Sequence, residues 1–185
     1  MNRNLLARLL NSRLARLAKD QSGVSAVEFA MLLPLMLTLY LGAVEVSQGI
    51  AADRKLAITA RTVADLVSQV TTIDNNGITN SLAAASAVMA PYPSNNLKVT
   101  VSSVTVDAQG NATIAWSDTL NGTAHGKGSS VSLPAALKTP GTSLIWAEVQ
   151  YAYKPTVGYL ISGTLTLKDQ IYMRPRLTDS VTRTI

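Results

Sequence analysis

An uncharged apolar run near the N-terminus limits the folds open to this chain more than any other feature. No charged residue occurs from Phe29 to Val44, and Glu28 is the only one in the stretch 24–44, about 21 residues. A helix rises about 1.5 Å per residue, so this stretch would measure roughly 30 Å, the thickness of a bilayer's hydrocarbon core. Leucine and methionine dominate it and favour helix over strand. The sequence therefore predicts one transmembrane helix.

Glu28 lies at the start of this run, where a carboxylate is unfavourable inside a bilayer. In one interpretation the span begins at Phe29, and Glu28 lies among the lipid headgroups. In the other, a peptidase cuts between Gly23 and Val24. The new α-amine would then lie on the same helix face as Glu28, four residues away, and could pair with it. The amine belongs either to the same chain or to a neighbouring subunit, and both pairings stay open.

The residues around Glu28 resemble a known processing motif. Gly23 is followed by four residues, then by Glu28, the aromatic Phe29 and the apolar run, and a basic segment precedes them. This order resembles the class IV prepilin motif of the Flp and Tad branch. The stretch 20–35, with its Leu33-Pro34 step, is similar to the opening of TadE/TadG-like minor pilins and pseudopilins. The resemblance covers most of 20–176 and favours a short TadE- or TadF-like form, because the sequence shows no von Willebrand-type metal site.

This resemblance implies that a prepilin peptidase, an aspartic-type membrane enzyme, removes a leader, residues 1–23. The mature chain would be a single-pass protein of the bacterial inner membrane. It would assemble with other pilin or pseudopilin subunits and with the inner-membrane platform of a Tad-type (type IVb, Flp) pilus that serves adherence and secretion. Glu28, Pro34 and Gly42 are the residues that we expect in subunit packing: membrane helices tolerate a kinking proline, and glycine permits close approach.

The net charge of +5 comes mostly from the leader. Five basic residues and one acidic residue give residues 1–23 a charge of +4, and the eleven basic and ten acidic residues that remain leave +1. We therefore expect no nucleic-acid binding. By the positive-inside rule, the N-terminus is cytoplasmic and the C-terminal domain periplasmic.

No pattern in the sequence is typical of an active site. The chain has no cysteine, and its single histidine, His125, has no nucleophile elbow beside it. The acidic residues Asp107, Asp118 and Glu148 are scattered, as expected of turn and surface charges. Arg174 and Arg176 are typical of salt bridges or a solvated edge. We therefore expect no catalytic residues, no cofactor, no metal site and no enzyme activity.

Three other interpretations remain. An ordinary signal peptide removed after the apolar run would place the new N-terminus near Asp53, but the run is longer than a typical signal-peptide core. A signal-anchored periplasmic binding module, using the sheet and the 118–141 loop to hold a partner, predicts an uncut leader. An anchored hydrolase predicts a polar pocket around His125.

The residue pattern after the apolar run predicts an α+β domain. The long hydrophobic helix continues as an amphipathic spine to 71, a turn cluster covers 71–77, and a second helix, capped by Thr79 or Asn80, runs from Asn80 to about Ala90. A period of two then predicts a roughly four-stranded antiparallel sheet. Its strands cover 97–106 (irregular at Ser102-Ser103), 112–117, 143–153 and 164–173. The predicted domains are 1–23, 24–71 and 72–185.

Overall fold

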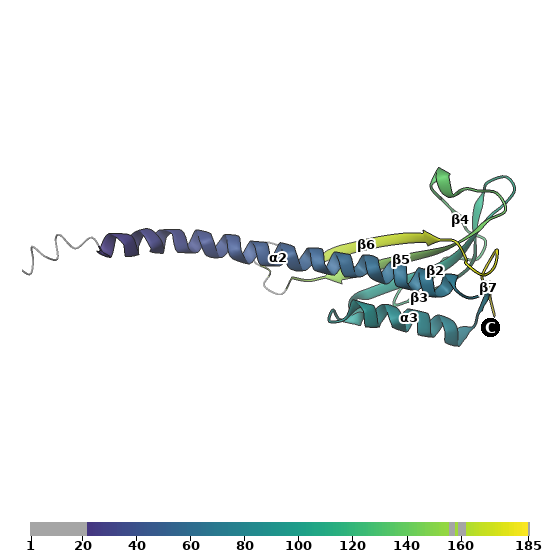
Figure 1. The fold of residues 1–185 in the computed structure, drawn as a ribbon, viewed down its shortest axis with the longest axis horizontal. Coiled ribbons are helices and arrows are strands. Elements are labelled where there is room, and N and C mark those ends of the chain that lie inside the picture. Colours follow the sequence, from purple (N-terminus) through teal and green to yellow (C-terminus); the bar gives the residue numbers. More distant parts are fainter. Residues whose placement is uncertain (1–21, 156–157, 159–161, 185) are drawn as a thin grey trace, which may run out of the picture. The chain divides into compact units, whose positions relative to one another are not determined.

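The structure, a computed structural model, describes residues 22–155, 158 and 162–184 (Figure 1). It divides into two units, residues 1–44 and 45–185. The predicted leader lies outside the described residues except for its last two residues.

Helix α2 (Ser22–Ser68) is the predicted hydrophobic helix, and it ends three residues earlier than expected. By length and composition it is able to cross a membrane. Pro34 lies in its interior and cannot donate a backbone hydrogen bond to the preceding turn. The hydroxyl of Thr38 donates to the carbonyl of Pro34 at 2.8 Å, one turn later.

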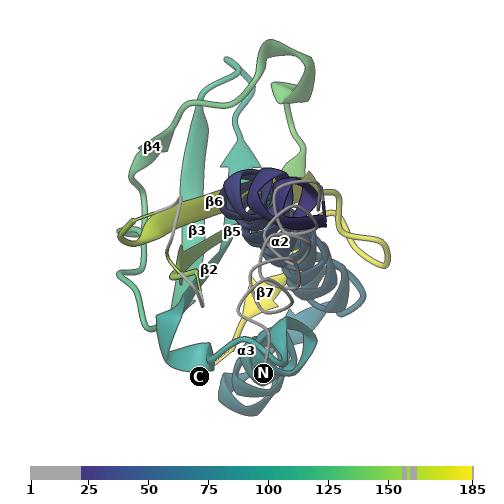
Figure 2. The same cartoon turned by 90° about the vertical axis from the view of Figure 1, so that its left-hand side faces the viewer.

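The 45–68 portion of α2 and helix α3 (Asn75–Met89) cover one face of the main sheet (Figure 2). Buried residues recur in α2 at spacings of three and four, which places them on one face of the helix. Leu56 and Val63 are fully buried there. This stripe confirms the predicted amphipathic continuation, and it packs against Val99 and Val101 of the sheet and Leu82 of α3 in a single core.

Helix α3 begins at Asn75, so the predicted turn cluster over 71–77 and the predicted caps at Thr79 or Asn80 are wrong. Asp74 is the N-cap: its carboxylate accepts a hydrogen bond from the Gly77 backbone amide at 2.7 Å. Such a cap satisfies an otherwise unpaired amide of the first turn and outweighs the poor helix propensity of Asn75, Asn76 and Gly77. A β-carbon at Gly77 would lie 3.0 Å from a side-chain carbon of Ile73, so a larger residue there would need the Ile73 side chain to shift by a few tenths of an ångström.

The main sheet has five strands in the order β4-β3-β2-β5-β6, all antiparallel. The predicted α+β class is confirmed, with one strand more than the four expected in this sheet. The strands are β2 (Leu97–Val106), β3 (Ala112–Leu120), β4 (Ser130–Val131), β5 (Ser143–Tyr153) and β6 (Leu165–Met173). Two single-turn helices, η1 (Ser94–Asn96) and η2 (Ala135–Leu137), flank them, and β1 (Thr72–Ile73) forms a separate parallel pair with β7 (Thr182–Arg183).

A β-bulge divides the sheet into two parts. Ser103 lies opposite Trp116 and Val104 opposite Ile114, so Ala115 is an extra residue in β3. The irregularity predicted at Ser102-Ser103 is therefore confirmed, although the extra residue lies in the partner strand. The bulge reverses the faces of β3, because one inserted residue shifts the alternation of side chains. Trp116 consequently joins the core beneath the helices, and Ile114 faces the other way.

The side of Ile114 carries a second, smaller core. Ile114, Val104 and Leu144 pack there with Leu133 from the connection after β4. The 121–141 connection therefore covers one end of this face. The other end of the same face is not covered by this core, and its side chains are polar.

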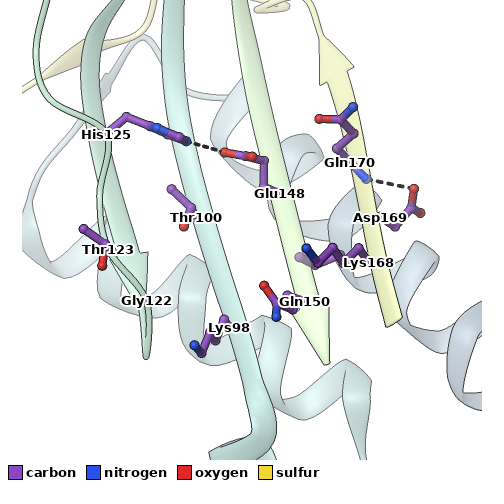
Figure 3. Close-up of a pocket in the computed structure, with 11 residues that line it drawn as sticks. Lys98, Thr100, Gly122, Thr123, His125, Glu148, Gln150, Lys168, Asp169 and Gln170 are labelled. Carbon is purple, nitrogen blue, oxygen red and sulfur yellow. Dashed lines mark hydrogen bonds and ion pairs between the residues drawn. The ribbon is translucent and has the colours of Figure 1, made fainter. Parts of the chain in front are cut away.

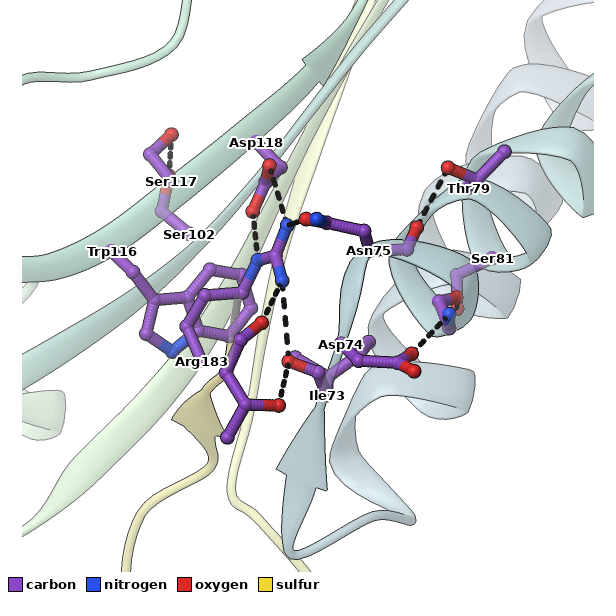
Figure 4. A network of polar contacts seen from close by, with 12 residues as sticks. Ile73, Asp74, Asn75, Thr79, Ser81, Ser102, Trp116, Ser117, Asp118 and Arg183 are labelled. Atoms are coloured by element: carbon purple, nitrogen blue, oxygen red, sulfur yellow. Dashed lines mark hydrogen bonds and ion pairs between the residues drawn. The ribbon is translucent and has the colours of Figure 1, made fainter.

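The C-terminal segment is tied to the helices and to β3 (Figure 4). The indole Nε1 of Trp116 donates to the carbonyl of Val181 at 2.7 Å. Arg183 forms an ion pair with Asp118, at 2.9 Å between Nε and Oδ2. Arg176 forms an ion pair with Asp65 of α2, one of the two environments expected for this residue.

Candidate functional site

The residues of the predicted processing site lie in the first two turns of α2. Val24 and Phe29 are 55% and 58% exposed, and Glu28 is exposed as well. A β-carbon added to Gly23 would meet no atom within 4 Å. Nothing in the described structure therefore depends on Gly23 being glycine, and the geometry leaves this segment accessible to another protein.

The rest of the apolar run presents large hydrophobic side chains to its surroundings. Met31 is 76% exposed and Leu39 is 65% exposed, and Pro34 is also exposed. Gly42 lies in the same helix two turns after Pro34 and, unlike Pro34, is buried. An exposed apolar surface of this extent is typical of a site that contacts a membrane or another protein.

A second candidate site, which the sequence analysis did not identify, lies on the polar part of the sheet face turned away from the helices. It is a groove of about 620 Å³ (Figure 3). Three elements supply its floor, β2, β5 and β6, and the loop after β3 forms one side. Its lining residues are Lys98, Thr100, Gly122, Thr123, His125, Glu148, Val149, Gln150, Lys168, Asp169 and Gln170.

His125 and Glu148 meet at this groove, with 2.5 Å between Nε2 of the imidazole and Oε2 of the carboxylate. The backbone amide of His125 donates to the hydroxyl of Ser117 at 3.1 Å, which fixes the loop to β3. The two residues are 23 positions apart and are brought together by strand pairing. The sequence analysis did not foresee this pairing of Glu148 with the single histidine.

The anchored hydrolase interpretation predicted a polar pocket around His125, and the groove is such a pocket. A hydrolase of the serine type also needs a hydroxyl nucleophile hydrogen-bonded to the imidazole. Within residues 22–155, 158 and 162–184, the ring of His125 has one hydrogen-bond partner, the Glu148 carboxylate. In the same residues, no group of three or more histidine, aspartate or glutamate side chains is placed to hold a metal ion.

Three rings stack beside the His125–Glu148 pair. His125 lies 4.9 Å from Trp146 with 14° between the ring planes, and Trp146 lies 5.7 Å from Tyr172 with 12° between the planes. The Trp146 indole donates to the side-chain oxygen of Gln170 at 3.1 Å. Burial raises the pKa of Tyr172 above its ordinary value, and the nearby Glu148 carboxylate adds to this effect.

The other end of the groove is a row of three side chains on adjacent strands. Lys98 of β2 lies opposite Gln150 of β5, and Gln150 lies opposite Lys168 of β6. Both lysines are exposed, and within the described part of the chain neither forms an ion pair. The sequence did contain a signal for this groove: at 146, 148 and 150 of β5, polar or aromatic residues alternate with buried ones.

The comparisons with known proteins bear on the helix. Residues 23–65 match the family model described as TadE-like protein. This match confirms the TadE-like resemblance over 23–65, which is α2 from Gly23 to near its C-terminus, and the resemblance of the rest of 20–176 stays a prediction. No curated protein and no solved structure matches the chain.

Proposed function

We propose, on the premise that residues 23–65 are TadE-like, that the chain is a minor pilin or pseudopilin of a Tad-type (type IVb, Flp) pilus. A prepilin peptidase cuts it after Gly23, and the mature protein begins at Val24. It remains in the bacterial inner membrane through α2, with its C-terminal domain in the periplasm, or enters a surface pilus used for adherence. Its role is structural rather than enzymatic.

The observation that carries this proposal is the exposed, apolar α2 that begins beside an accessible Gly23. The match to the TadE-like family lies on this helix, and the helix is long and apolar enough to cross a membrane. Its partners would be the membrane, the prepilin peptidase, other pilin subunits and the assembly platform. Glu28 would pair with an α-amine of its own or of a neighbouring subunit, and Pro34 and Gly42 would lie in the packed surface.

The test is the N-terminus of the membrane-associated protein, read by intact mass with and without a co-expressed prepilin peptidase. We expect a start at Val24 when the peptidase is present and at Met1 when it is absent. A start at Met1 in both samples would favour the signal-anchored binding module. A start near Asp53 would identify an ordinary signal peptide and overturn the proposal.

The variant Gly23→Val tests whether the peptidase recognises Gly23. A β-carbon at this position meets nothing within 4 Å, so we expect the substitution to leave the fold intact and to change only what the peptidase encounters. We expect the variant to stay uncut, while Ser25→Ala, two residues away on the same exposed turn, is cut normally. Equal processing of both variants would contradict a recognition role for Gly23.

A further inference from the structure

The groove on the outer face of the sheet is not used by the proposed pilin role, which rests on α2. We propose that this groove binds an acidic saccharide. In this arrangement an anionic group of the sugar lies between Lys98 and Lys168, above Gln150. Its hydroxyl groups lie over the neighbouring row formed by Thr100, Glu148 and Gln170.

The positive charges of Lys98 and Lys168, which lie on either side of Gln150 in a row across three strands, favour binding of an anion. Adjacent strands lie about 4.8 Å apart, so the backbones of Lys98 and Lys168 are about 10 Å from each other, with Gln150 between them. The flexible four-carbon stem of each lysine allows the two ammonium groups to converge on a group above Gln150. Two carboxylates, Glu148 and Asp169, also line the groove, but neither forms an ion pair with Lys98 or Lys168. Among the described residues, an incoming anion would therefore not have to displace an ion-pair partner of either lysine.

The second row of side chains in the groove is suited to binding the hydroxyl groups of a sugar. Thr100 lies opposite Glu148, and Glu148 lies opposite Gln170, so a hydroxyl, a carboxylate and an amide stand side by side on three strands. The Thr100 hydroxyl already lies 3.1 Å from that of Thr119, and the Gln170 oxygen accepts from Trp146 at 3.1 Å. The remaining capacity of the row still includes both donors and acceptors, such as the Gln170 amide nitrogen and the second oxygen of Glu148. Sugar hydroxyls also donate and accept, and adjacent hydroxyls on a ring match the two atoms of a planar carboxylate or amide. His125 holds one oxygen of Glu148, which fixes the orientation of the carboxylate.

The lining argues against a peptide. Ligand sites that recognise apolar side chains are built mainly from hydrophobic and aromatic residues. Among the described residues that line this groove, Val149 is the single aliphatic one. Strand addition inside the groove is also excluded, because the backbone groups of β5 are already paired with β2 on one side and with β6 on the other.

The test is calorimetric titration of the full chain in detergent micelles with three probes of equal length: tetragalacturonate, the uncharged galactose tetrasaccharide and a tetraglutamate peptide. We expect the acidic saccharide to bind and the other two to bind at least about tenfold more weakly, since each lacks one of the two matching chemistries. Binding of the acidic saccharide should weaken as salt is added.

The double variant Lys98→Gln, Lys168→Gln should weaken tetragalacturonate binding about tenfold, because two exposed charge-assisted contacts are lost together. Lys138→Gln, an exposed lysine in another part of the domain, is the matched control and should leave binding unchanged. Equal thermal unfolding of the variants verifies that the fold is intact.

Three results would overturn the proposal: no heat of binding with any probe, equal affinity for the neutral and the acidic saccharide, or binding of the glutamate peptide alone. None of them depends on cleavage at Gly23, so the saccharide proposal and the pilin proposal can fail separately.

Discussion

Replacing Arg183 by methionine keeps much of the side chain's length and removes its charge and its hydrogen bonds. The guanidinium binds three other parts of the domain. Nε donates to Oδ2 of Asp118 at 2.9 Å, Nη2 donates to the side-chain oxygen of Asn75 at 2.5 Å, and Nη1 donates to the carbonyl of Ile73 at 3.4 Å. The substitution therefore removes the hydrogen bonds by which this side chain joins β7 to β3 and to the start of α3, while the backbone pairing of β7 with β1 remains.

The size of the effect follows from the burial of the pair. Exposed ion pairs contribute about 0–1 kcal/mol, whereas removing one partner of a buried pair costs about 3–5 kcal/mol. The side chains of Arg183 and Asp118 are 18% and 28% exposed, which lies between these cases. We expect Arg183→Met to lower the free energy of unfolding by about 2 kcal/mol, because the Asp118 carboxylate is left partly buried without its cation.

The assay is thermal unfolding of the full chain in detergent, followed by the near-ultraviolet circular dichroism of its buried tryptophan. A loss of about 2 kcal/mol lowers Tm by roughly 4–8 °C in a domain of about 150 residues. Arg174→Met is the matched control: Arg174 is exposed, and among the described residues its guanidinium donates a single 3.5 Å hydrogen bond, to the hydroxyl of Thr139. Its Tm should change by less than a third of that amount.

Equal Tm values for the two arginine variants would refute the reasoning. A double-mutant cycle with Asp118→Asn gives a second check. If the two residues act as a pair, the double variant should be less destabilised than the sum of the single variants.

Three further predictions concern the core and two titrating groups. Leu56 is fully buried, so Leu56→Ala should lower the free energy of unfolding by about 2–5 kcal/mol. Ile58 is 55% exposed, so Ile58→Ala should change the same quantity by about 0.5 kcal/mol or less in the same thermal assay. The pKa of Tyr172 is raised above 10.0 by burial, so its contribution to stability is present below pH 10 and is lost as pH rises through the raised value. A tyrosinate absorbance titration compared with Tyr172→Phe measures this. The side-chain hydrogen bond from Asn111 is the main cause that lowers the pKa of Asp107 below 3.8. The contribution of Asp107 to stability is therefore present above pH 3.8 and is lost as pH falls through the lowered pKa. An NMR titration of Asn111→Ala should show the pKa of Asp107 move back up.

Local patterns were sufficient to predict most of the domain's elements. The apolar run, the three- and four-residue spacing around Leu56 and the period of two from Leu97 each reflect one buried face of one element. The structure has these elements within a few residues of the predicted bounds. The predicted start of α3 was wrong because one side-chain cap, at Asp74, outweighed the poor helix propensity of the three residues 75–77.

The groove could not be predicted from local patterns, because its parts come from four separate segments. His125 meets Glu148 only when β5 pairs with β2 and the loop after β3 folds over the sheet. No periodicity encodes such a meeting. The lysine row likewise depends on the register of three strands, which places Lys98 and Lys168 on either side of Gln150.

The alternation of β5 has a consequence for how this protein can change in evolution. Its residues Ala147 and Tyr151 belong to the core beneath the helices, while Glu148 and Gln150 belong to the groove on the opposite face. Substitutions on opposite faces share few neighbours, so their effects should add with little epistasis. A lineage could therefore exchange the groove residues for new ones, one at a time, while the helix-packed core that supports them stays constant.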